Sequence, residues 1–365
     1  MLHGMLCRSI VLLFPLLLML LLLGCQSSPA RTPDAPRAYV AGQPAVPPVI
    51  DGRLDDPAWA DAPWTDDFID IEGDVKPRPR FRTRAKMLWD DEYFYVAAWM
   101  PEPHVWGTLT ARDSIIYNDN DFEVFIDPDG DSHDYYELEV NALNTQFDLM
   151  LTRPYRCGGS FDIGGDIDGL QTAVDIDGTL NDASDEDRLW TMEIAIPWAS
   201  LASHANRPIP PNDGDHWWVN FSRVEWQHEL VDGAYRRKPG VREDNWVWSR
   251  QDAIDMHRPQ YWGRVQFSAA APGVAGYVVG DDEPARTTIR RIHAASEQWR
   301  GANGQWPEQL ADLEGLWEPV EDPSLSEPVL SIEEGQLMVR FQQTMSNGEI
   351  RQWQLGPLCR VEASQ

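Results

Sequence analysis

The chain has 365 residues, of which 59 are acidic and 30 basic, so its formal net charge at pH 7 is −29. A surface of this charge cannot neutralise a phosphate backbone, which excludes nucleic acid as a partner. The length leaves room for one large domain and a smaller one.

The N-terminus has the pattern of a lipoprotein signal peptide. Arg8 precedes an apolar run at residues 10–23, which is shorter than the roughly 20 residues that a membrane-spanning helix needs. The run leads into Leu-Leu-Gly-Cys, which resembles a lipobox, so residues 1–25 are predicted to be a signal peptide with Cys25 as the lipidated mature N-terminus. Ordinary secretion with a free Cys25 thiol is the alternative. Gln26 favours the outer membrane as the destination.

Residues 26–48 are rich in Pro, Ala and Ser, and we expect them to form an extended tether. Between residues 49 and 268, short apolar-polar alternations are divided by turn residues, and no long amphipathic helix interrupts them. Strands are predicted at residues 84–89 and 93–99 (a hairpin), 122–127, 137–141, 190–196, 217–226 and 261–267. This pattern predicts a mainly β fold, an antiparallel β-sandwich.

The C-terminal part has a different pattern. Residues 269–282 are predicted to be a linker, and residues 283–365 a small α+β appendage. A helix is expected at 284–300, a short helix or turn at 308–316, and strands at 329–332, 337–343 and 352–355, with a hairpin turn at Asn347-Gly348. The sequence of this appendage does not indicate its role.

Two cysteines remain after signal cleavage and lipidation, Cys157 and Cys359. An oxidising compartment would allow them to form a disulfide. The sequence alone leaves this pairing open, because the two residues are far apart along the chain.

Polar residues on neighbouring predicted strands suggest a binding site. If strands 121–127 and 135–142 form one hairpin, Glu123 lies near Glu137 or Glu139 across the ladder. Like charges in this position destabilise a sheet unless a cation, Arg223 or ligand hydroxyls offset them. The candidate ligand-binding residues are Tyr117 and Trp248 for stacking and Glu123, Glu139, Asn141, Arg223 and His257 for hydroxyl contacts. A solvated sheet face with Arg223 as a structural counter-ion is the alternative.

A second candidate site is a metal loop. Asp127, Asp129, Asp131 and Asp134 alternate with small and turn residues and offer hard oxygen ligands to Ca²⁺. Asp and Gly also dominate ordinary hairpin turns, which is the other interpretation.

No catalytic motif stands out. The chain has no nucleophile elbow, no His-Glu-x-x-His and no Gly-rich phosphate loop, so we expect a protein that binds rather than catalyses. Seventeen Trp residues fit either a ring-filled sandwich core or stacking on sugars.

From residue 49 to 268 the chain resembles the family 9 carbohydrate-binding modules. The resemblance rests on Ile-Asp-Gly-x-Leu-Asp-x-x-x-Trp at 50–59, Leu-Trp-Asp-Asp-Glu-Tyr-Phe-Tyr-Val at 88–96, Asp-x-Glu-Val-Phe-Ile-Asp at 121–127, Glu-x-Asn at 139–141, Trp-x-x-Glu-x-x-Ile-Pro-Trp at 190–198 and Trp-Gly at 262–263. It implies a β-sandwich that is often attached to enzymes degrading plant polysaccharides and sometimes carries structural calcium.

The same resemblance implies a sugar held between two Trp rings, and here this chain departs from it. Tyr117 stands in place of one Trp, and Met256-His257 in place of the other. Glu123 corresponds to the family's sugar-binding glutamate, whereas Glu139 stands where the family has an arginine. The identity of the glycan is therefore open.

These patterns together predict a lipid-anchored envelope protein that binds oligo- or polysaccharides and supports their breakdown by partner enzymes. Its contact with the membrane would be through the lipid alone. One alternative is an envelope scaffold whose C-terminal appendage binds another protein. The other is a glycoside hydrolase.

Overall fold

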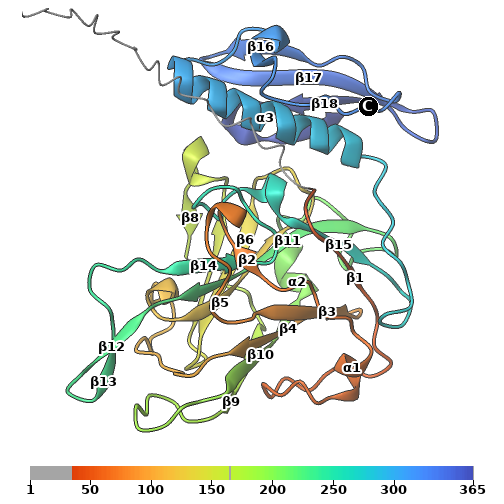
Figure 1. The fold of residues 1–365 in the computed structure, drawn as a ribbon. Helices are drawn as coiled ribbons and strands as arrows, with labels where there is room; N and C mark the ends of the chain where they lie inside the picture. Colours follow the sequence, from red (N-terminus) through yellow and green to blue (C-terminus); the bar gives the residue numbers. More distant parts are fainter. Residues whose placement is uncertain (1–34, 164–165, 365) are drawn as a thin grey trace, which may run out of the picture.

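The computed structural model describes residues 35–163 and 166–364 (Figure 1). The predicted signal peptide and Cys25 lie outside these residues. Within the described ranges, no helix combines the length and apolarity needed to cross a membrane.

Two sheets pack face to face and form the main body. The larger sheet has the order β1 (Ala38–Ala41), β15 (Gly263–Phe267), β11 (His216–Glu225), β5 (Asp121–Asp127), β6 (Tyr135–Asn141), β7 (Gln146–Leu151) and β8 (Phe161–Asp162), and β14 (Asp244–Val247) joins β11 to β2 (Ile69–Asp70). The smaller sheet has the order β3 (Arg84–Trp89), β4 (Tyr93–Pro101), β10 (Leu189–Pro197) and β9 (Gln171–Asp177). The predicted antiparallel β-sandwich is confirmed.

Short elements connect these strands. They are the helices α1 (Pro57–Ala60) and α2 (Trp198–Leu201), the hairpin of β12 (His228–Val231) and β13 (Ala234–Arg237), and the 3-10 turns Gly73–Val75, Ile116–Asn118, Tyr155–Cys157 and Pro259–Tyr261. Most of them contribute buried side chains to the two faces of the sandwich or to its edges, among them Trp59 of α1, Trp198 of α2 and Tyr235 of β13.

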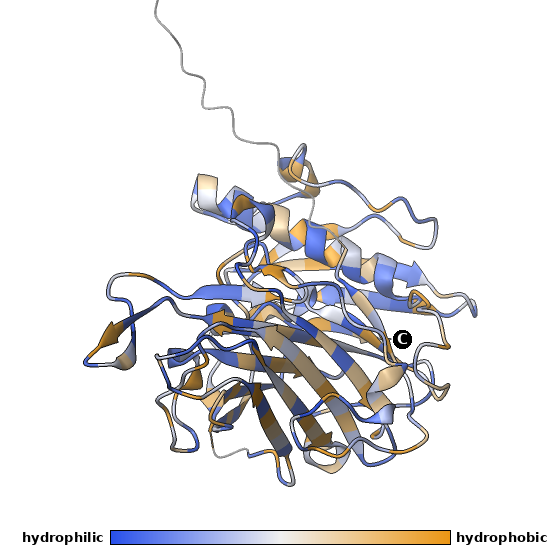
Figure 2. Cartoon of the chain, turned by 60° about the horizontal axis from the view of Figure 1, so that its bottom comes forward, coloured by the Kyte–Doolittle hydropathy of each residue, from blue (hydrophilic) through white to orange (hydrophobic). Residues whose placement is uncertain are grey.

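Alternation along each strand separates the two faces of the larger sheet. In β5, Phe122, Val124 and Ile126 point into the core between the sheets, whereas Glu123 and Phe125 point outward. Figure 2 shows the same alternation of apolar and polar residues along the strands of the sandwich. The side chain period of two therefore fixes which residues are available on the outer face.

The structure places a β-strand within residues 26–48, which were predicted to be an extended tether. Ala38–Ala41 forms β1, which pairs in parallel with β15, and the side chains of Tyr39 and Ala41 are buried. Alternate burial of Tyr39 and Ala41 anchors this segment, although its Ala- and Pro-rich surroundings resemble a linker.

The C-terminal unit is a helix on a four-stranded antiparallel sheet. Helix α3 (Glu283–Asn303) lies along the sheet of β16 (Val329–Glu333), β17 (Gln336–Thr344), β18 (Ile350–Leu355) and β19 (Val361–Ser364), with 3-10 turns at Leu310–Leu313 and Pro357–Cys359 (Figure 1). Ile289, Ile292 and Ala295 of α3 share one apolar core with Phe341 and Trp353. The chain between residues 269 and 282 contains no helix or strand.

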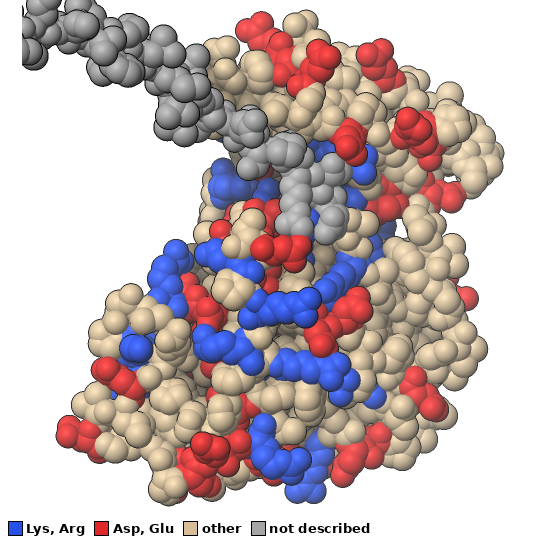
Figure 3. All heavy atoms as spheres, viewed as in Figure 1, with Lys and Arg blue, Asp and Glu red and all other residues tan. Residues whose placement is uncertain are grey.

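The C-terminal unit is held against the outer face of the larger sheet by ion pairs and by a disulfide. Its Glu283 lies 3.1 Å from Nε of Arg264 on β15, and Arg286 stacks on Trp218 of β11 with its guanidinium carbon 4.2 Å from the ring centre. Cys157 and Cys359, whose pairing the sequence left open, form a disulfide. Figure 3 shows Lys and Arg side chains across the middle of this view, interspersed with Asp and Glu.

Candidate functional site

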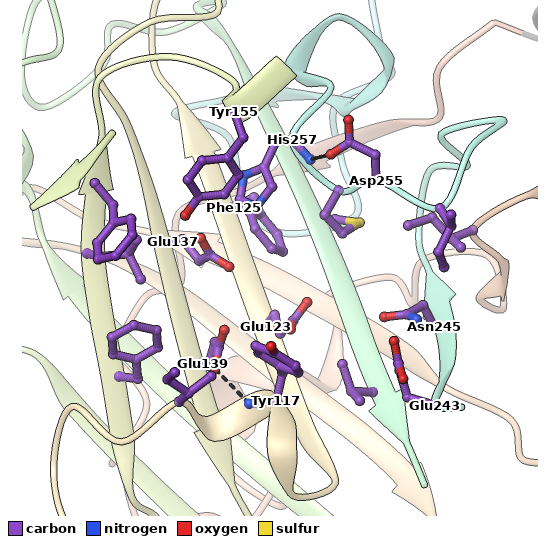
Figure 4. A pocket seen from close by; sticks show the side chains of 18 of the residues that line it. Tyr117, Glu123, Phe125, Glu137, Glu139, Tyr155, Glu243, Asn245, Asp255 and His257 are labelled. Atoms are coloured by element: carbon purple, nitrogen blue, oxygen red, sulfur yellow. Dashed lines mark hydrogen bonds between the residues drawn. The ribbon is translucent and has the colours of Figure 1, made fainter. Parts of the chain in front are cut away.

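A cavity of about 520 Å³ lies on the outer face of the larger sheet. Its floor comes from β5, β6 and β7, and its walls come from the segments around Tyr117, Tyr155 and His257 (Figure 4). The size falls within the range of small-molecule sites, about 300–1,000 Å³.

Three glutamates converge on the floor of this pocket. Glu123 of β5 is directly opposite Glu139 of β6, and Glu137 is two residues along the same face. One carboxylate oxygen from each of the three lies within 4.8 Å of the other two. The side chains are only 3–7% exposed. The strand register therefore places three largely buried acids together on the pocket floor.

Burial makes the ionised forms of these acids costly. It raises the pKa of Glu123 to about 7. The pKa values of Glu137 and Glu139 are raised well above the ordinary value, first by burial and then by the neighbouring charge of Glu123. Glu139 accepts a hydrogen bond from the Tyr117 N–H at 2.8 Å. Glu137 points into the pocket and is only 7% exposed (Figure 4). Despite this burial, it has no hydrogen bond or ion pair with any residue that the structure describes.

Exposed aromatic rings surround the mouth of the pocket. Tyr117, Tyr155 and Phe161 are 43%, 45% and 49% exposed. Within residues 35–163 and 166–364, no other Phe, Tyr or Trp is more than 36% exposed, and all three of these rings line the pocket. Apolar rings gathered at one opening, while every Trp is at least partly buried, indicate a contact surface for a ligand.

His257 forms part of one wall of the pocket, where its neutral imidazole can donate or accept a hydrogen bond. Its Nδ1 lies 3.1 Å from the hydroxyl of Tyr135, and its ring centre is 4.5 Å from that of Tyr155. Burial lowers the pKa of His257 to about 4, so the imidazole is uncharged at neutral pH.

Of the seven predicted ligand-binding residues, four line this pocket and three do not. Tyr117, Glu123, Glu139 and His257 are brought together. Arg223 and Trp248 lie in the core between the two sheets, 0% and 1% exposed, and do not face the pocket. Arg223 pairs with Phe122 in the ladder, so it points to the opposite face from Glu123.

Asn141 is also a structural residue. It is fully buried, donates to the Leu109 carbonyl and to Asp119 at 2.9 and 3.0 Å, and accepts from the backbone N–H of Leu143 and Thr145. These bonds use its amide to fix the turn after β6, and it does not line the pocket.

The sequence missed several pocket residues. The sequence places Glu137 near Glu123, but Glu137 is not among the predicted ligand-binding residues, although its position two residues before Glu139 puts both on one face. Tyr155, Phe147 and Phe161 are absent from the residues predicted from the sequence. Phe147 could have been found from its opposite position to Glu139. Tyr155 lies in a 3-10 turn, where no periodic signal exists.

The predicted metal loop is partly assembled. Carboxylate oxygens of Asp127, Asp129 and Asp131 lie within 4.8 Å of one another, whereas Asp134 is not part of that group. Burial and the neighbouring acids raise the pKa values of Asp127 and Asp129. Arg360 of the C-terminal unit lies 2.7 Å from Asp131 and compensates part of this charge.

Solved structures of similar fold include two from Caldicellulosiruptor kristjanssonii. Both are carbohydrate-binding modules of family 9, one in complex with cellotriose and one with glucose. They are 17% and 16% identical to this chain, with TM-scores of 0.43 and 0.42, and each match covers 67% of this chain and 100% of the module.

Sequence comparison matches the chain to a curated relative and to a family model. Exoglucanase XynX of Acetivibrio thermocellus is 29% identical over 154 residues, which are 42% of this chain and 12% of XynX, so the chain spans only a small part of that enzyme. The model of the family described as carbohydrate family 9 binding domain-like matches residues 50–269, and the chain belongs to that family.

Proposed function

We propose that this protein binds glycans in the pocket on the outer face of the larger sheet and has no catalytic activity of its own. The observation that carries the proposal is the combination of three exposed rings at the mouth with buried carboxylates on the floor. Rings pack against the apolar C–H face of a pyranose, and carboxylates accept hydrogen bonds from its hydroxyls. Family membership supports this function.

Glycoside hydrolysis requires two carboxyl groups on either side of the scissile bond, about 5–9.5 Å apart. Glu123, Glu137 and Glu139 project side by side from adjacent strands of one sheet, with one oxygen of each within 4.8 Å of the others. Release of reducing sugar by the wild type that disappears in Glu123→Gln or Glu139→Gln would contradict the non-catalytic function.

Replacing Tyr117 and Tyr155 together with Ala is expected to weaken oligosaccharide binding at least tenfold. Loss of two rings removes packing worth more than the 1.4 kcal/mol that a tenfold change represents. Binding would be found on a glycan array and measured by isothermal titration calorimetry. Leu230→Ala, which removes a 53% exposed apolar side chain on the β12–β13 hairpin, is the control and should bind like the wild type. A folded wild-type protein that binds no glycan would overturn the proposal in favour of the protein scaffold.

The proposal includes export as a lipoprotein, with Cys25 acylated and the sandwich held in the cell envelope at the outer membrane, in support of polysaccharide breakdown by partner enzymes. The short apolar run and the lipobox at 22–25 support it. Labelled palmitate should be incorporated into the wild type in cells and not into Cys25→Ala.

Calcium binding at the Asp127 loop belongs to the same proposal. The carboxylates of Asp127, Asp129 and Asp131 offer the oxygens that Ca²⁺ prefers, and Arg360 competes for that of Asp131. Calcium at about 100 times its dissociation constant should stabilise the fold by about 2.7 kcal/mol. Thermal unfolding with Ca²⁺ and with EDTA measures this, and Asp129→Asn should abolish the difference. Equal melting temperatures in both buffers argue for an ordinary turn.

A further inference from the structure

The three glutamates of the pocket floor lack a cation. Among the described residues, no Lys, Arg or His forms an ion pair with Glu123, Glu137 or Glu139. Arg223, the expected counter-ion, lies on the opposite face of the sheet and pairs with Glu102 and Glu225.

The rest of the lining does not supply the missing charge. Its one basic side chain of fixed charge, Arg242, stands at the rim, 75% exposed, and pairs with Glu243 at 3.4 Å. His257 is neutral, because burial lowers its pKa to about 4. The floor is therefore a buried cluster of three carboxyl groups for which the described residues supply no counter-ion, and it opens toward the pocket.

The spacing of the carboxylates matches one ammonium group. Three oxygens up to 4.8 Å apart can all lie at a hydrogen-bond distance of about 2.8 Å from a single nitrogen at their centre. An ammonium carries three N–H donors, one for each carboxylate. Buried polar groups normally have a hydrogen-bond partner. Glu137 is buried and has none in the described structure, so its carboxylate is free to accept a hydrogen bond from a ligand.

A bare metal ion fits this pocket less well than an organic cation. Hard cations take six to eight oxygen ligands, whereas Phe125, Phe147, Leu149 and Ile71 make up much of the wall around the glutamates. The cavity of about 520 Å³ has room for a sugar ring beneath the exposed aromatic side chains. The carboxylates of the floor require a positive charge, and the aromatic rings of the mouth require a flat apolar surface. A pyranose that carries an ammonium group meets both requirements.

We infer that the pocket selects glycans with a free primary amine, that is, polymers containing glucosamine that is not N-acetylated. This inference rests on the proposed glycan binding and specifies its ligand class. The amine enters the carboxylate triad while Tyr117 and Tyr155 pack on the sugar face. Because the glutamates must be ionised to hold an ammonium, binding should release protons.

Calorimetry with three β-1,4-linked trisaccharides tests the inference. We expect the glucosamine trisaccharide to bind at least tenfold more tightly at pH 7 than cellotriose or the N-acetylglucosamine trisaccharide. Its binding enthalpy should differ between phosphate and Tris, which reports the released protons. Glu137→Gln should reduce the preference to less than twofold, while Glu229→Gln, which removes one exposed charge on the β12–β13 hairpin, should keep it.

The outcomes separate this inference from the proposed function. Cellotriose binding as tightly as the glucosamine trisaccharide overturns the amine preference and leaves glycan binding intact. Binding of other array glycans but of none of the three trisaccharides would likewise overturn the amine preference and leave glycan binding intact. An array without any bound glycan overturns both. Heat from Ca²⁺ or Mn²⁺ alone that disappears in Glu137→Gln would show that the triad holds a metal, and the inference would be wrong.

Discussion

Replacing Arg223 with Ala is expected to lower the free energy of unfolding by about 3–5 kcal/mol at pH 7, because it leaves buried charge uncompensated. The guanidinium is 0% exposed and lies 2.7 Å from Glu102 and 2.9 Å from Glu225. It also donates to the carbonyl of Pro101 at 3.1 Å. Urea unfolding followed by tryptophan fluorescence measures the loss.

A matched exposed pair provides the control. Arg188 lies 2.6 Å from Asp177, but its side chain is 76% exposed, and exposed pairs contribute about 0–1 kcal/mol. Arg188→Ala should therefore change stability by less than 1 kcal/mol. Similar losses in the two variants would mean that the Arg223 cluster is hydrated and contributes no more than a surface pair.

The Arg223 loss should also depend on pH. Burial, followed by the charge of Glu225, already raises the pKa of Glu102 well above 4.5, and removing Arg223 raises it further. A raised carboxyl pKa gives stability that is present below the unfolded pKa and is lost as the pH rises. The variant should therefore be closest to the wild type near pH 4.5 and furthest from it above pH 7.

Arg223 also shows where sequence reasoning stops. The alternation in β5 and β10 was clear, because apolar and polar residues separate cleanly there, and the sandwich followed from it. β11 reads His-Trp-Trp-Val-Asn-Phe-Ser-Arg-Val-Glu, with large residues on both faces. The register of β11 against β5 places Arg223 opposite Phe122, so that Arg223 points inward. The sequence of β11 alone does not determine this register.

The pocket was predictable only where it rests on strands. Glu123 and Glu139 followed from the hairpin of β5 and β6. The rings at the mouth, by contrast, come from irregular segments, and Tyr155 is held in place next to Cys157 by a disulfide to the C-terminal unit. The 17 Trp residues fit either a ring-filled core or stacking platforms, and the structure uses them mainly as core; Trp248, which was predicted to stack on a ligand, is one of the core rings.

The ligand-free protein should become more stable when Glu123 is replaced with Gln, by about 3 kcal/mol above pH 7. Burial raises the pKa of Glu123 from 4.5 to about 7, and each pKa unit corresponds to about 1.36 kcal/mol. The folded state thus keeps a proton that the unfolded state loses, so stability is full below pH 4.5 and declines as the pH rises to 7. Gln mimics the protonated carboxyl, so the two proteins should be equally stable below pH 4.5 and differ most above pH 7.

Glu283 provides the opposite case. Although burial opposes it, the charges of Arg264 and Arg290 lower the pKa of Glu283 to about 2. Its contribution is present above pH 4.5 and is lost as the pH falls toward 2, so Glu283→Gln should destabilise the protein at pH 7. Unfolding curves of Glu123→Gln and Glu283→Gln between pH 4 and 8 should show opposite changes in stability at neutral pH. The two acids differ because the described residues supply cations to Glu283 but not to Glu123.

This contrast explains why destabilising acids on the pocket floor are informative. A carboxylate that lowers stability at neutral pH and has no cation beside it among the described residues is retained most simply for something that binds it. Glu123→Gln should accordingly raise stability while it weakens binding of the glucosamine trisaccharide, whereas a merely structural acid would lose stability on substitution. A variant that is less stable at pH 8 than the wild type would show that the fold, and not a ligand, requires the charge at Glu123.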